Sequence, residues 1–93
     1  MRRTLLQSAA FTRAARRLVK RRAEIIPLLQ ATLEAMGQDV YQPSLKTHKL
    51  KGDLAGLLAC SVGYDVRIVF EIVPHQDSEA ILLQSVGSHD EVY

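Results

Sequence analysis

The sequence predicts an α+β fold in which a pair of helices covers one side of an antiparallel sheet. Apolar residues recur with a period of about 3.6 over residues 9–39, as they do in amphipathic helices. From residue 57 onward they fall instead into three β-rich runs separated by short turn sequences. A chain of 93 residues is long enough for one hydrophobic core, so we expect a single domain, 1–93.

A short strand and a basic helix are the first elements expected. Residues 3–8, RTLLQS, form an apolar run bounded by charge and serine, which favours an edge strand. Ser8 suits the N-cap of a helix over residues 9–22, in which Phe11 and Leu18 lie at helical spacing. The basic residues of this helix lie on another face and give it a cationic outer surface: Arg13, Arg16, Arg17 and Lys20.

A second helix is predicted over residues 23–39, where the apolar positions keep the helical period. Pro27 is acceptable only in a first turn, and Gly37 stands where a C-cap belongs. The two helices therefore form a hairpin that breaks near Arg22.

The sequence pattern of the second half of the chain predicts an antiparallel meander. Residues 41–56 contain one proline, two glycines and three lysines and are expected to be an irregular connection. The runs 57–62, 66–73 and 80–86 are then joined by the turns GYD and PHQDSE. Side chains alternate along the middle run, so Val66, Ile68, Phe70 and Ile72 face the core and Arg67, Val69, Glu71 and Val73 face away from it.

Charge is distributed unevenly along the chain. Residues 1–22 hold eight basic and no acidic side chains, whereas the remaining 71 hold four basic and ten acidic ones. This split predicts a basic face that binds a polyanion. An arginine-rich, acid-free start also occurs in organellar transit peptides, but here the basic stretch continues into the next helix without a linker.

Composition also limits the class of protein. A hydrophobic content of 47% argues against disorder, and no apolar run approaches the roughly 18 residues of a membrane span. The single cysteine, Cys60, permits no internal disulfide, which favours a reducing compartment such as the cytosol. A zinc site built from Cys60 with His48, Asp65 and His89 is disfavoured, because these residues include no ligand pair of recognised short spacing.

Five polar residues stand where packing does not require them: His48, Asp65, Arg67, His89 and Tyr93. Each alone is explained as an ordinary surface or turn residue, and His75 is read in the same way. Together they match metal-free RNA cleavage, which needs a base, an acid and a cation that holds the charge growing on phosphorus. A tyrosine can stack on an unpaired base. The basic helix and three lysines supply phosphate contacts: Lys46, Lys49 and Lys51.

Three segments in order, HKLKG (48–52), VGYDVRIVFEI (62–72) and SVGSHDEVY (85–93), resemble the RelE/ParE superfamily of bacterial toxins, and within it the YafQ-like mRNA interferases. The resemblance covers nearly the whole chain. It implies a RelE-like fold and the toxin of a type II toxin-antitoxin pair in the bacterial cytoplasm. Such a toxin enters the ribosomal A site, cuts mRNA there without a metal or other cofactor, and is inhibited by a cognate antitoxin protein.

The resemblance also implies roles for individual residues. Asp65 or His48 would be the base, His89 the acid, Arg67 the phosphate-binding group and Tyr93 the residue that orients a nucleobase. Two positions depart from the family pattern: Cys60 and Ser61 stand where a strand histidine is usual, and Val66 replaces an aromatic residue.

Two other functions remain open from the sequence. The first is a ParE-like toxin that poisons gyrase without cutting nucleic acid; the histidine and tyrosine near residue 93 argue against it, since such members tend to lack them. The second is a plain nucleic-acid-binding module with solvated polar groups. Nuclease function requires the five polar residues to line one concave surface.

Overall fold

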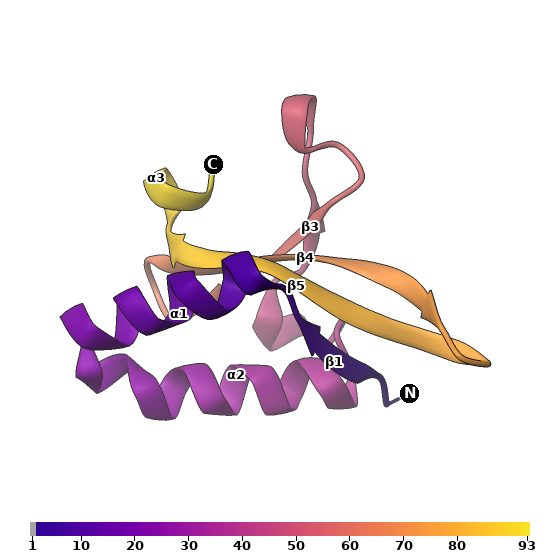
Figure 1. Ribbon diagram of the computed structural model, residues 1–93, viewed down its shortest axis with the longest axis horizontal. Helices are drawn as coiled ribbons and strands as arrows, with labels where there is room; N and C mark the ends of the chain where they lie inside the picture. The colour runs from indigo at the N-terminus through magenta and orange to yellow at the C-terminus, as the bar shows by residue number, and fades with distance from the viewer. Residues whose placement is uncertain (1) are drawn as a thin grey trace.

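The computed structural model describes residues 2–93 and has one five-stranded sheet with the order β1-β5-β4-β3-β2. Two long helices lie on one face of this sheet, and a short third helix lies on the other (Figure 1). The predicted α+β fold is confirmed. Within residues 2–93, no helix is long and apolar enough to cross a membrane. The strands are β1 (Thr4–Gln7), β2 (His48–Lys49), β3 (Leu58–Val62), β4 (Val66–His75) and β5 (Ser78–Ser88), and the helices are α1 (Ala9–Arg21), α2 (Ile26–Gln38) and α3 (His89–Val92).

Helix α1 begins where the sequence predicts. The Ser8 hydroxyl accepts a hydrogen bond from the Phe11 amide (3.0 Å), which satisfies one of the free N–H groups of the first turn. Phe11 and Leu18 are both 2% exposed and anchor the helix on β5. Lys20 and Arg21 lie in the last turn, where positive charge interacts favourably with the helix dipole.

Helix α2 follows a single 3-10 turn at Ala23–Ile25 and carries Pro27 in its first turn, as expected. The prediction for Gly37 is wrong, because the helix continues to Gln38 and its C-cap is Asp39. Gly37 is buried inside the last turn, and its carbonyl accepts a hydrogen bond from the Arg3 amide (2.7 Å). The residue therefore joins α2 to the chain just before β1 instead of ending the helix.

The predicted meander of β3, β4 and β5 is confirmed, and β1 is an edge strand that pairs with β5 in parallel. The six-residue turn predicted at 74–79 is wrong, because β4 continues to His75 and β5 begins at Ser78, so Pro74 pairs with Glu79. Other features of the sheet were not predicted. The connection 41–56, expected to be irregular, contains the two-residue strand β2, which pairs antiparallel with β3. The register of β4 and β5 also shifts between Val69 and Phe70, which marks a β-bulge.

The two faces of β4 differ as the alternation predicts. Val66, Ile68 and Phe70 are fully buried in the core beneath the helices. Arg67 lies on the opposite face and is half-buried. Val69 shares that face but is only 2% exposed, paired with small residues of the adjacent strands, Ala59 and Ser85.

The N-cap of α1 can be tested by substitution. Ser8→Ala should lower the free energy of unfolding by about 1 kcal/mol, because the Phe11 amide loses its acceptor. Ser8→Asp keeps an acceptor and should retain most of the stability. Urea unfolding measures both variants, and equal losses in the two would contradict a capping role for Ser8.

Candidate active site

The candidate site lies on the face of the sheet that α1 and α2 leave uncovered. Helix α3 and the segment between β2 and β3 both rise from this face (Figure 1). Strand pairing places Arg67 of β4 between Ser61 of β3 and Gly87 of β5. Since residues paired across a sheet point to the same side, all three lie on the uncovered face.

A surface depression of about 420 Å³ brings together three of the five predicted site residues. It is lined by Tyr64, Asp65, Arg67, Ser88, His89 and Asp90. These residues come from the turn between β3 and β4, from β4 and from the junction of β5 with α3. The hairpin and the end of β5 are adjacent because Val66 pairs with Ser88.

Arg67 is held in place by its own hairpin. Its Nη1 donates hydrogen bonds to the carbonyls of Tyr64 (3.1 Å) and Val66 (2.9 Å). Among the described residues, no partner accepts a hydrogen bond from its Nε or Nη2. The guanidinium is therefore oriented and retains donors that can bind a phosphate.

Asp65 lies at the rim of the depression in an ion pair. The Nη1 of Arg22 donates to both carboxylate oxygens of Asp65, at 3.1 and 2.9 Å. Arg22 also pairs with Glu24 (3.0 Å), so three side chains form a small network at the end of α1. Asp65 thus ties the β3–β4 hairpin to the helical layer, and its oxygens already accept hydrogen bonds from a cation.

His89 and Tyr93 contact each other across the single turn of α3. Their rings meet edge to face with centroids 4.5 Å apart. Burial raises the pKa of the Tyr93 phenol, and the nearby Arg67 guanidinium acts in the opposite direction. The phenol therefore lies close enough to Arg67 to sense its charge, and the imidazole of His89 remains largely exposed beside it.

His48 lies on the same face but does not line this depression. It pairs with Ala59 of β3, which pairs with Val69 of β4. From strand spacings of about 4.8 Å and a rise of about 3.3 Å per residue, the Cα atoms of His48 and Arg67 are on the order of 12 Å apart. The Nδ1 of His48 lies 3.0 Å from the Lys46 carbonyl, which can only accept, so Nδ1 donates and Nε2 is left as a free acceptor.

Cys60 and Ser61, the departures from the family pattern, face opposite sides of β3. Cys60 is fully buried on the core side, with its Sγ 3.6 Å from the Sδ of Met36. Burial raises the pKa of the Cys60 thiol to about 12. Of these two residues, Ser61 faces the candidate site, because it pairs with Arg67.

The predicted RNA-binding cations are all exposed. The four basic residues on the outer side of α1 have no carboxylate within 4.0 Å among the described residues: Arg13, Arg16, Arg17 and Lys20. The three lysines lie in or near β2: Lys46, Lys49 and Lys51. Lys49 pairs with Leu58, which pairs with the core residue Phe70, so Lys49 points to the opposite side of the sheet from His48.

Sequence reasoning assigned no role to Tyr64, which is 95% exposed at the tip of the β3–β4 hairpin. An aromatic residue inside a turn sequence is the signal that could have identified it. Elsewhere in the described chain, residues 2–93, no group of three His, Cys, Asp or Glu side chains is placed to hold a metal ion.

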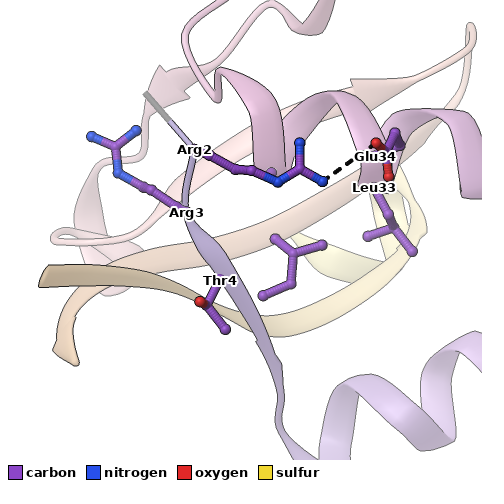
Figure 2. Close-up of a pocket in the computed structure, with 7 residues that line it drawn as sticks. Arg2, Arg3, Thr4, Leu33 and Glu34 are labelled. Atoms are coloured by element: carbon purple, nitrogen blue, oxygen red, sulfur yellow. Dashed lines mark ion pairs between the residues drawn. The ribbon is translucent and has the colours of Figure 1, made fainter. Parts of the chain in front are cut away.

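A larger depression of about 480 Å³ lies between β1 and α2, away from all these residues. Figure 2 shows that Arg2 spans it toward Glu34, at 3.5 Å. Arg3 next to it pairs with Glu79 (3.2 Å). Because both of its arginines are paired with carboxylates, this depression is a structural feature of the strand–helix contact.

Comparison with known proteins identifies the fold and the family. The family model described as the bacterial toxin of a type II toxin-antitoxin system, YafQ, matches residues 3–93. YafQ from Escherichia coli has a TM-score of 0.76 at 15% identity, covering 98% of each chain. The E. coli DinJ-YafQ toxin-antitoxin complex scores 0.75 at 16% identity, covering 100% of this chain and 99% of the other. A YoeB/ParE toxin from Agrobacterium tumefaciens scores 0.75 at 14% identity, covering 92% and 98%. No curated protein sequence matches the chain.

The orientation of Cys60 gives a chemical prediction. With its thiol buried and its pKa near 12, Cys60 should resist alkylation by iodoacetamide at pH 8 in the folded protein. The same thiol should react readily in urea. Rapid alkylation of the native protein, followed by mass spectrometry, would show that the strand is turned the other way.

Proposed function

We propose that this chain, which belongs to the YafQ family of bacterial type II toxin-antitoxin toxins, is a metal-independent endoribonuclease that cuts mRNA in the ribosomal A site. The observation that carries the proposal is the grouping of Arg67, His89 and Tyr93 on the uncovered face of the sheet. A phosphate-binding cation beside an exposed imidazole supplies two of the groups that phosphodiester cleavage needs, the charge-stabilising group and one proton-transfer group.

The reaction requires one proton to be removed and one to be supplied. A base takes the proton of the ribose 2′-hydroxyl, and the 2′-oxygen attacks the adjacent phosphorus. The bond from phosphorus to the 5′-oxygen breaks, and an acid protonates that oxygen. The products are a 2′,3′-cyclic phosphate and a 5′-hydroxyl.

His48 is favoured over Asp65 as the base. The hydrogen bond from Nδ1 of His48 to the Lys46 carbonyl orients the ring and leaves the Nε2 lone pair free to take a proton. Both oxygens of Asp65 instead accept from Arg22. Asp65 then acts on the reaction only by fixing the hairpin that carries Arg67.

His89 is the proposed acid and Arg67 the group that stabilises the charge on phosphorus. The exposed imidazole of His89 lines the same depression as the guanidinium. Tyr93 packs edge-on against His89 and so restricts its orientation. This fits a site in which a phosphate bound by Arg67 has its leaving oxygen within reach of His89.

RNA is held outside the reacting centre by stacking and charge. The exposed ring of Tyr64 lies at the edge of the depression, where an unpaired base next to the cut can stack on it. The exposed basic side chains of α1 and β2 supply contacts to mRNA and ribosomal RNA phosphates. A cognate antitoxin protein is the expected inhibitor, as DinJ is paired with YafQ in the E. coli complexes.

His89→Ala tests the acid. The variant should cut ribosome-bound mRNA about 10² to 10⁴ times more slowly than wild type, because the leaving oxygen loses its proton donor. His75→Ala is the matched control, since this histidine lies at the far end of β4. RNA 5′-end mapping after induction, together with a purified translation assay, measures all three proteins.

Two results would contradict the function. If wild type arrests growth without cutting mRNA and traps gyrase on DNA, the ParE-like alternative replaces it. If His89→Ala cuts as fast as His75→Ala, His89 is not the acid.

Tyr64→Ala tests the stacking contact. Loss of a stacked base should weaken binding of a short single-stranded RNA by about 1 to 3 kcal/mol, whereas Tyr64→Phe should bind as wild type does. Tyr41→Ala, which removes a ring 57% exposed and 5.9 Å from Arg3, should change nothing. Fluorescence anisotropy measures the affinities, and equal affinity for Tyr64→Ala and wild type would remove Tyr64 from the site.

A further inference from the structure

The positions of two site residues, His89 and Tyr93, depend on helix α3, which is too short to be stable by itself. Helix α3 spans only His89–Val92, one turn, and an isolated turn of helix is unstable in water. Its ring pair, His89 with Tyr93, closes that turn but does not attach it to the sheet. Something else must fix its position.

Glu91 makes the contacts that attach helix α3 to the sheet and to α1. Its Oε1 accepts a hydrogen bond from the Ser88 amide (2.8 Å), and the Ser88 side chain accepts in return from the Glu91 amide, which completes a capping box. The same carboxylate pairs with Arg21 of α1, with Nη1 to Oε2 at 3.1 Å and Nη2 to Oε1 at 3.3 Å. One side chain thus joins the end of β5, the start of α3 and the end of α1.

Gly87 makes room for this arrangement. It is buried, and a Cβ at this position would lie 3.0 Å from the Glu91 Oε1 and 3.1 Å from the Glu91 Cβ. The Glu91 side chain therefore lies directly on the β5 backbone, in the row that contains Arg67. The Ser88 amide and Arg21 together lower the pKa of Glu91 to about 2, so the carboxylate is ionised at neutral pH.

We propose that Glu91 is a positioning residue of the site: with Arg21 and Gly87 it locks α3 onto the sheet so that His89 and Tyr93 stay beside Arg67. Glu91 acts through α3 and does not touch the RNA. The activity part of this inference rests on the proposed endoribonuclease function, whereas the positioning part does not.

Four variants separate the contacts. Glu91→Ala removes the capping acceptor and the ion pair, and Glu91→Gln keeps an acceptor but loses the charge that attracts Arg21. Gly87→Ala leaves the carboxylate intact and displaces it. The control is Glu34→Ala, which breaks the exposed pair with Arg2 shown in Figure 2, far from the site.

NMR of the purified toxin gives the readout that needs no activity. In wild type and Glu34→Ala, the ring protons of His89 and Tyr93 should show mutual nuclear Overhauser effects, and the Ser88 amide should exchange slowly. In Glu91→Ala and Gly87→Ala these effects should be lost while the core resonances of Phe70 and Ile68 stay in place. Glu91→Gln should retain part of them.

Cleavage of ribosome-bound mRNA gives the second readout. Misplacing an acid by about an ångström costs up to roughly a hundredfold in rate, so Glu91→Ala should cut at least about tenfold more slowly at saturating toxin. The toxin concentration for half-maximal rate should change by less than about twofold, because the charges that bind RNA are unaltered. The double variant with Arg21→Ala and Glu91→Ala should cut mRNA no more slowly than Glu91→Ala alone. Each substitution breaks the same ion pair, so the second adds no further loss.

The inference is overturned if Glu91→Ala keeps the contact between the His89 and Tyr93 rings, or if it loses that contact and still cuts at the wild-type rate. If wild type cuts no mRNA at all, the proposed function has failed. In that case the NMR comparison alone still decides whether Glu91 positions α3.

Discussion

The alternation of side chains along β4 is the constraint on which the rest of the structure depends. Val66, Ile68 and Phe70 are fully buried beneath the helices, and this packing fixes which way the strand faces. A shift of one residue would move all of them to the other side, so the register is strongly determined. Since only one face is covered, the same packing turns Arg67 outward and leaves it accessible. The site is thus a consequence of where the core is.

Local patterns in the sequence predicted the local structure well. The Ser8 cap, the breaking point near Arg22 and the two faces of β4 depend on residues within a few positions of each other, where spacing and residue type are sufficient. Gly37 shows the limit of such reasoning: the residue type suits a C-cap, but the actual helix end is set by contact with the chain at Arg3. Strand β2 has only two residues and no periodic pattern to reveal it.

The long-range contacts of the site could not be predicted, because they join residues far apart in sequence. The ion pair of Arg22 with Asp65 spans 43 positions, and that of Arg21 with Glu91 spans 70. The sequence therefore left Asp65 and His48 as equal candidates for the base. Their hydrogen-bond partners distinguish them: the Lys46 carbonyl leaves Nε2 of His48 free, whereas both oxygens of Asp65 already accept from Arg22.

The same pairs change the meaning of the uneven charge distribution. Four of the eight early basic residues bind carboxylates elsewhere in the chain: Arg2, Arg3, Arg21 and Arg22. Half of the apparent polyanion-binding charge is therefore used to hold the fold together and to attach α3 and the β3–β4 hairpin.

Arg67 stands on a central strand that the core keeps rigid, whereas His89 stands on a single turn of helix that depends on one carboxylate. In the proposed endoribonuclease, the placement of the acid relative to the phosphate is then set by surface ion pairs, which are individually weak. Under the proposed function, the packed strand fixes where RNA binds, and the weaker attachment of α3 controls how well the bound RNA is aligned for cleavage.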